Sequence, residues 1–142
     1  MARDKLDTLL RLRRLAVQDR MRALAAAMRT EEQACQALGA CAQTIVQETA
    51  EARSMAEFDA ALAGFVPWRA RAAQALRDAE AQAAHAGEAT RTAQAMLGEA
   101  RGAMRAMELA LERRKAATDL ATQRSTQHAL DDATRRSGIA DR

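Results

Sequence analysis

Apolar residues recur at heptad spacing along the first half of the chain. Positions spaced in this way form one stripe along a helix and are typical of a coiled coil, so we expect a first long helix over about residues 4–53. Its spine, interrupted once by Glu31, is Leu10, Val17, Leu24, Leu38, Ile45 and Ala52. The flanking row expected to complete the buried stripe is Met21, Met28, Cys35 and Ala42.

The second half has a more regular pattern, in which apolar or small residues alternate steps of three and four. Such steps stay on one face of a helix, so we expect a second long helix over about residues 68–136. The short tail, residues 137–142, should fray. The spine of this helix is Leu76, Ala79, Ala83, Ala86, Thr90, Ala93, Leu97, Ala100, Met104, Met107 and Leu111.

Residues 54–67 separate the two patterns and form the expected elbow, which holds the chain's only proline and both phenylalanines. In one version, Ser54 and Glu57 form a capping box that starts a short helix, and Gly64 ends it. In the other version, the first helix continues through Ser54 and breaks only between Gly64 and Pro67. Both versions place Pro67 in the first turn of the second helix, where its missing N–H costs little.

Two long helices joined by a short connection fold back antiparallel. The predicted fold is therefore all-α: a long antiparallel two-helix coiled-coil hairpin in one domain over residues 1–142, with or without a short helix at the elbow. Antiparallel partners have a constant sum of residue numbers, and a sum of 121 pairs Ile45 with Leu76 and Leu10 with Leu111. This register leaves the end of the second helix, from about residue 117, without a partner.

Composition and charge narrow the classes of function. Hydrophobic residues make up 49% of the chain but aromatic residues only 2%, because alanine supplies most of the apolar content. An alanine methyl gains little on burial, so an enclosed substrate cavity is hard to build. Basic residues outnumber acidic ones 8 to 3 over residues 1–30 and 10 to 7 over 91–142, but the ratio is 4 to 9 over 31–90. A basic open end and an acidic elbow half suit two different partners, and they equally suit simple solubility.

The sequence has no pattern typical of an enzyme. It lacks a glycine-rich phosphate loop, a Walker motif and a nucleophile elbow. We therefore expect no catalytic residues, no cofactor and no small-molecule substrate. In the register above, His85 lies opposite Gln36 and next to Cys35, and Glu88 is the only further ligand type nearby, so we expect no metal site.

Other partner classes are disfavoured as well. Basic residues near both termini are interleaved with acids and lack aromatic stacking partners, so nucleic acid is not an expected partner. No run of 18 apolar residues could form a membrane span. Cys35 and Cys41 are six residues apart on one helix, point to different sides and are expected to be free thiols, as suits a reducing cytoplasm.

Three stretches of the chain resemble one known family. The first helix opens with Leu-Asp-Thr-Leu-Leu-Arg-Leu-Arg-Arg-Leu-Ala over residues 6–16, and Phe-Val-Pro-Trp over 65–68 is similar to the aromatic start of the family's second helix. The most similar stretch begins with Met-Glu-Leu-Ala-Leu-Glu-Arg-Arg-Lys over 107–115 and continues with Leu120, Arg124, Gln127, Leu130, Asp131, Asp132, Arg135 and Arg136. Together they resemble the flagellar export protein FliJ family, to which the YscO family of injectisomes is similar.

The resemblance implies a cytoplasmic, non-enzymatic component of the type III protein export apparatus, peripheral to the inner membrane. FliJ-like proteins are similar to the stalk of rotary ATPases: the end with both termini inserts into the hexameric ring of the export ATPase, FliI in flagella, and promotes its assembly and activity. Another surface contacts the export gate, FlhA, and export chaperones also bind. The implied ring contacts are Leu6, Leu9, Arg11, Arg13, Arg14, Arg124, Gln127, Leu130 and Arg135. The implied gate contacts are Phe65, Val66 and Trp68.

Two functions outside this family stay open. A generic coiled-coil scaffold would pair its helices between chains, and a basic nucleic-acid accessory protein would bind oligonucleotides with a steep salt dependence. The open end carries more apolar surface than a two-helix seam needs, which favours a partner-binding end. The leucines concerned are Leu6, Leu9, Leu12 and Leu15.

Overall fold

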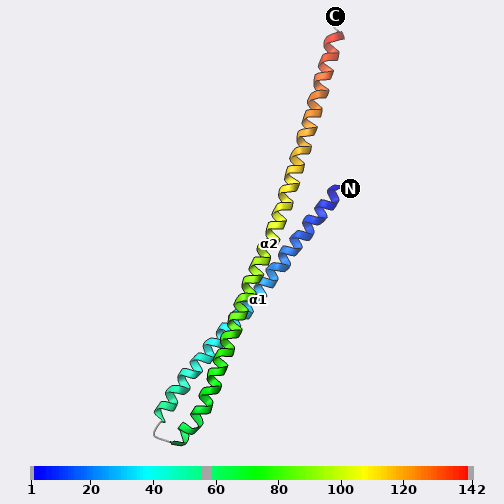
Figure 1. Cartoon of the computed structure of the whole chain (residues 1–142). Helices are drawn as coiled ribbons and strands as arrows, with labels where there is room; N and C mark the ends of the chain where they lie inside the picture. The colour runs from blue at the N-terminus through cyan, green and yellow to red at the C-terminus, as the bar shows by residue number, and fades with distance from the viewer. Residues whose placement is uncertain (1, 56–58, 141–142) are drawn as a thin grey trace. The chain divides into compact units, whose positions relative to one another are not determined.

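The computed structural model describes residues 2–55 and 59–140, with side chains described over 5–55 and 63–136. Two α-helices, α1 (Ala2–Ser54) and α2 (Asp59–Ala140), account for nearly all of these residues, and no strand occurs among them. The chain divides into a hairpin unit, Val17–Glu99, and a terminal unit, made of Met1–Ala16 and Ala100–Arg142. Each helix contributes to both units, and Figure 1 shows each helix by its label and colour.

In the hairpin unit, α1 and α2 pack against each other along the predicted spines. The antiparallel two-helix hairpin is thereby confirmed. Its most buried residues are Val17, Ala86, Thr90 and Leu97, and only 5% of Leu97 is exposed. The buried Thr90 hydroxyl donates to the Ala86 carbonyl oxygen at 3.2 Å, so its polar group is satisfied within the helix. The remaining predicted spine positions of this unit, Glu31 included, are half-buried.

The flanking row predicted for α1 is wrong. Met21, Met28, Cys35 and Ala42 are all exposed. The sheltered row lies three residues after each spine position instead of four, and it consists of Ala27, Ala34, Cys41 and Glu48. Mostly small side chains at the interface let two helices approach closely, whereas the larger methionines lie at the solvent-exposed edge.

Two pairs of neighbours across the helices have residue numbers that sum to slightly less than the predicted 121. In the hairpin unit, the Arg20 guanidinium lies 3.6 Å from the Met96 sulfur, a pair whose numbers sum to 116. The Glu31 carboxylate lies beside Gly87, a pair that sums to 118, and a Cβ added at Gly87 would stand 3.3 Å from its Oε1. Gly87 therefore makes room for the one acidic residue in the spine.

The break predicted between Gly64 and Pro67 is absent, and both versions of the elbow are wrong there. Helix α2 begins at Asp59 and continues through both residues, and Gly64 does not adopt a positive φ. Ser54 is the last residue of α1, and its hydroxyl donates to the Glu51 carbonyl oxygen at 2.7 Å instead of capping a following helix. Glu57, the other half of the expected capping box, lies outside the described residues.

Pro67 lies nine residues into α2, where it removes one backbone hydrogen bond. A proline inside a helix costs about 3 kcal/mol or more. Phe65 and Trp68 flank Pro67 and are both half-buried, and burial of large apolar side chains stabilises by about 1.5–3 kcal/mol each when complete. Partial burial of these two rings therefore offsets part of the cost of the proline.

The terminal unit has a short seam. Leu6 and Leu10 of α1 are half-buried, as are Met104, Met107 and Leu111 of α2. The Arg14 guanidinium lies 3.9 Å from the Glu108 carboxylate, a cross-helix pair whose numbers sum to 122. Among the residues of this unit whose side chains are described, none is fully buried.

Beyond the seam, every residue from 112 to 136 is exposed. This run contains the predicted overhang, 117–136, and begins five residues earlier. The sequence pattern explains this exposure, because the positions that continue the steps of three and four after Leu111 are almost all polar. Those positions are Arg114, Thr118, Ala121, Ser125, His128 and Asp132. With only one alanine among them, they offer almost no apolar surface to a partner helix of this chain.

Candidate interaction surfaces

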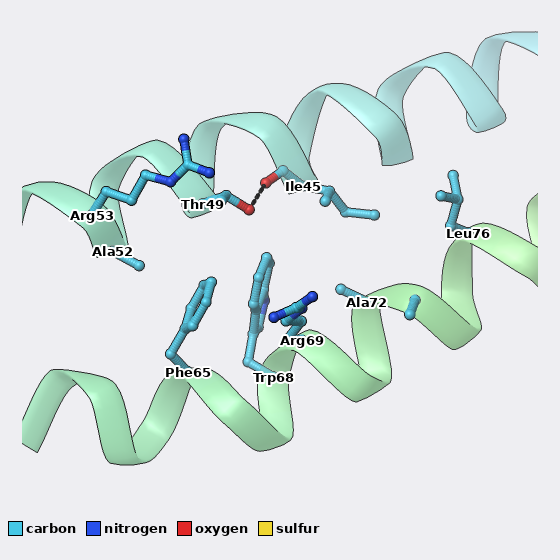
Figure 2. A pocket seen from close by; sticks show the side chains of 10 residues that line it. Ile45, Thr49, Ala52, Arg53, Phe65, Trp68, Arg69, Ala72 and Leu76 are labelled. Atoms are coloured by element: carbon cyan, nitrogen blue, oxygen red, sulfur yellow. Dashed lines mark hydrogen bonds between the residues drawn. The ribbon is translucent and has the colours of Figure 1, made fainter. Parts of the chain in front are cut away.

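A groove lies between α1 and α2 in the part of the hairpin unit next to the turn, and we name it the elbow groove (Figure 2). Its volume is about 470 Å³, within the range of about 300–1,000 Å³ that ligand pockets have. Its lining residues are Ile45, Thr49, Ala52 and Arg53 of α1, and Phe65, Trp68, Arg69, Ala72, Ala73 and Leu76 of α2.

Two aromatic rings and three alanines create this groove. Phe65 and Trp68 are three residues apart on α2, so their side chains are neighbours, and their rings stack with centroids 5.2 Å apart and planes 22° apart. Figure 2 shows both rings rising from α2 toward α1. The lining alanines beside them, Ala52, Ala72 and Ala73, are too small to fill the space that the rings open between the helices.

Two arginines give the elbow groove its charge. Arg53 and Arg69 line it from opposite helices, and both are exposed. Neither has an ion pair or a side-chain hydrogen bond anywhere in the described part of the chain. The lining also includes one hydroxyl, on Thr49, which already donates to the Ile45 carbonyl oxygen at 2.6 Å. The side-chain donors of the lining without a hydrogen-bond partner among the described residues are therefore the two guanidinium groups and the indole N–H of Trp68.

The predicted gate contacts are brought together only in part. Phe65 and Trp68 share the elbow groove, but Val66 does not line it and is 71% exposed. Sequence reasoning missed Arg53 and Arg69. A signal existed for Arg69, which follows Trp68 directly and lies four residues after Phe65 on the same helix face. Arg53 carried no such signal, because a basic residue in the last turn is common at any helix C-terminus.

A second groove in the hairpin unit, of about 640 Å³, is lined mainly by alanine. It places His85 with Thr30 and Ala34 of α1, and neither of the predicted neighbours, Cys35 and Gln36, is among its lining residues. In the residues that the structure describes, no three potential metal ligands of the His, Cys, Asp and Glu types gather. The full lining is Ala27, Thr30, Ala34, Ala81, Gln82, His85, Ala86 and Ala89.

The α1 part of the terminal unit exposes the predicted ring contacts on several faces. Leu9 is exposed while Leu6 is half-buried. Arg11 and Arg13 are both exposed. Residues two positions apart on a helix point about 160° away from each other, so these two arginines lie on nearly opposite faces. Arg14 is exposed as well, although it lies near Glu108. The leucines outside the predicted contacts, Leu12 and Leu15, are also exposed.

The α2 part of the terminal unit exposes the other predicted ring contacts. At about 100° per residue, Arg124, Gln127 and Arg135 lie within about 80° of one another, whereas Leu130 points about 120° away from Arg124. Leu120, which the predicted set omits, lies on the face shared by the first three and is 50% exposed. That face combines one leucine, one amide and two guanidinium groups.

The two units carry opposite net charge. By sequence, the terminal unit has 14 Lys and Arg against 8 Asp and Glu, a formal charge of +6. The hairpin unit has 8 against 11, a formal charge of −3. Net charge influences which partners associate with a surface and how fast they do so. The two units therefore suit different partners.

No protein family, curated protein or solved structure matches this chain. Within the described residues, neither helix combines the length and the apolarity that crossing a membrane requires. Function is therefore inferred from the two surfaces above and from the stretches of sequence that resemble the FliJ family.

Proposed function

We propose that this chain is a non-enzymatic stalk of a bacterial type III protein export apparatus. Its terminal unit enters the hexameric ring of an export ATPase of the FliI kind and promotes ring assembly and ATP hydrolysis. Its hairpin unit contacts an export gate of the FlhA kind, and export chaperones bind as well. The site of action is the cytoplasmic face of the inner membrane, where the protein is peripheral.

The observation that carries this proposal is the exposed run of α2 over residues 112–136. Most helical stability in proteins comes from packing of an amphipathic face, and helices without it are marginal in water. This run packs on no other described part of the chain, and it contains four threonines, which are weak helix formers. A partner that encloses the run would supply the missing contacts.

Charge supports the assignment of different partners to the two units. The terminal unit is basic and the hairpin unit is acidic. Exposed leucines accompany the basic groups of the terminal unit, at Leu9, Leu12 and Leu15 of α1 and at Leu120 and Leu130 of α2. Apolar side chains surrounded by arginine are well suited to a protein partner, because arginine is enriched at interfaces and apolar patches mark them.

The test measures ATP hydrolysis by the cognate export ATPase as the full chain is titrated in. We expect strong stimulation by the native chain, which is lost when the chain ends after Ala116 or when Arg11 and Arg13 are both changed to Glu. Arg14→Glu is made separately and together with Glu108→Arg, because these two groups lie 3.9 Å apart and the double variant restores their opposite charges.

The matched control is the variant Arg71→Glu with Arg77→Glu in the hairpin unit, which reverses two exposed arginines outside both proposed contact surfaces. It should stimulate the ATPase as the native chain does. If the chain that ends after Ala116 and the variant Arg11→Glu with Arg13→Glu both stimulate fully, the terminal unit is not the ring contact and the proposal is wrong.

A homodimeric coiled-coil scaffold is the second candidate, and the alanine-lined groove favours it, because small residues let another helix approach closely. Sedimentation of the full chain at micromolar concentration separates the two. A stalk is monomeric before it meets the ring. A scaffold sediments as a dimer, and Ala34→Arg in that groove would dissociate it.

A further inference from the structure

We propose that the elbow groove selects a partner helix that carries both apolar anchors and carboxylates. The inference rests on the proposed function only in taking this groove as a contact with another protein. It adds the chemistry of the occupant, and it assigns Arg53 and Arg69 as the residues that set specificity. The occupant is an acidic amphipathic helix of about three turns.

The apolar part of the occupant follows from the dimensions of the groove. Its α2 wall extends from Phe65 to Leu76, a distance of eleven residues or about 16 Å along a helix. A helix lying in such a groove uses anchors three, four and seven residues apart. Phe65 and Trp68 provide half-buried rings at one end, and Ile45 and Leu76 provide aliphatic side chains at the other.

The acidic part of the occupant follows from Arg53 and Arg69, which have no ion pair within the described residues. Arg69 follows Trp68 on α2, and Figure 2 labels both among the side chains that line the groove. An apolar partner without carboxylates would cover these guanidinium groups and remove their water without replacing it. A carboxylate can accept two parallel hydrogen bonds from each guanidinium. Complementary charge at this position therefore gives specificity as well as affinity.

The occupant is a protein helix and not a polyanion. Two cations face the groove, and the hairpin unit that contains it has a formal charge of −3. Nucleic acid is bound by many phosphate contacts, and an anionic membrane by clusters of basic residues. A helix with a few carboxylates among apolar anchors matches two arginines on an otherwise acidic unit.

The experiment uses the fluorescence of Trp68, the only tryptophan of a chain without tyrosine. Three helical peptides of about 15 residues without tryptophan or tyrosine serve as probes. One carries leucines at helical spacing and glutamates beside them, the second replaces each glutamate by lysine, and the third is a scramble of the first. We expect the acidic peptide to shift Trp68 emission to shorter wavelength and to bind about tenfold more tightly than either of the others.

Variants of the chain test whether peptide binding depends on the residues of the elbow groove. Arg53→Glu with Arg69→Glu should reverse the preference, so that the lysine peptide binds more tightly than the glutamate peptide. Ala72→Leu with Ala73→Leu fills the groove without changing its charge and should weaken the binding of both peptides. Arg71→Glu with Arg77→Glu is the matched control and should bind as the native chain does. Helix content by circular dichroism, unchanged in each variant, confirms that folding is retained.

Equal affinity for the acidic and lysine peptides, or for the acidic peptide and its scramble, would overturn the inference. Tighter binding of a single-stranded oligonucleotide or of phosphatidylglycerol vesicles than of the acidic peptide would overturn it as well, if Arg53→Glu with Arg69→Glu removes that binding. These outcomes leave the proposed ring contact untouched, because stimulation of the export ATPase depends on the terminal unit and is measured separately. Conversely, selective peptide binding by a chain that fails to stimulate the ATPase would support this groove and reject the stalk.

Discussion

The hairpin unit and the end of α2 are both helical, but different contacts support them. In the hairpin unit, Ala86, Thr90 and Leu97 are buried between the helices. From residue 112 to 136, no residue is sheltered. Both stretches contain alanine, the strongest helix former, although the run from 112 to 136 also contains four threonines, which are weak helix formers. What separates them is an apolar stripe, present in the first and replaced by polar residues in the second.

The comparison shows that pairing ends where the stripe ends. Leu111 is the last sheltered residue of α2 up to residue 136, where the described side chains end, and the next stripe positions begin with Arg114 and Thr118. Stability should therefore be concentrated in the hairpin unit, while the exposed run unfolds locally at low cost. Such a run is suited to fold around or within a partner, which is the role proposed for it.

The largest expected effect comes from removing one buried leucine. Leu97→Ala should lower the free energy of unfolding by about 2–4 kcal/mol, as truncations in a packed core do. The matched substitution Leu120→Ala, at a half-exposed position of the unpaired run, should change it by less than about 0.5 kcal/mol. Urea denaturation followed by circular dichroism measures both. Similar losses at the two positions would show that the run has a packing partner within the chain.

An intermediate effect is expected at the proline inside α2. Pro67→Ala restores a backbone hydrogen bond and a helix-forming residue, so it should stabilise the hairpin unit by roughly 1–3 kcal/mol. The same denaturation experiment measures the gain. A loss of stability would mean that the proline holds Phe65 and Trp68 in place more strongly than it weakens the helix.

The smallest effect compares two glycines of the hairpin unit. Nothing lies within 4 Å of a Cβ added at Gly98, so Gly98→Ala should stabilise by about 0.5–1 kcal/mol. At Gly87 the added Cβ stands 3.3 Å from the Glu31 carboxylate. Gly87→Ala should therefore stabilise the protein less than Gly98→Ala does, or destabilise it. Thermal unfolding of the two variants gives the difference. Equal gains at both would show that the Glu31 side chain moves aside freely.

Periodicity was enough to predict both spines, because alternating steps of three and four leave no other way to bury an apolar stripe. The flanking row predicted for α1 was wrong because it lies four residues after each spine position, at Met21 and Met28, whereas the sheltered row lies three residues after, at Ala27 and Ala34. Close helix packing favours these smaller side chains. Local turn rules failed at Gly64 and Pro67, since a helix supported by tertiary contacts tolerates residues that end an isolated one.

The elbow groove could not be predicted from the sequence. It exists because Phe65 and Trp68 stand beside small residues of both helices, and the size of that space depends on the distance between the helices. The charge at its edge comes from Arg53 and Arg69, and many other arginines likewise have no ion pair within the described residues. Only their place beside the groove distinguishes these two arginines. The exposed leucines of the terminal unit, in contrast, follow from excess apolar positions in the pattern.

Native-state hydrogen exchange, measured residue by residue, tests most directly whether helix packing stabilises the hairpin unit but not the exposed end of α2. We predict that amides from about residue 83 to 99 exchange only at the rate of global unfolding, while those from 117 to 136 exchange at least about 100-fold faster, a difference of about 2.7 kcal/mol. Adding the export ATPase should slow exchange in the second stretch alone. Equal protection of both stretches in the free chain would contradict this view of the molecule.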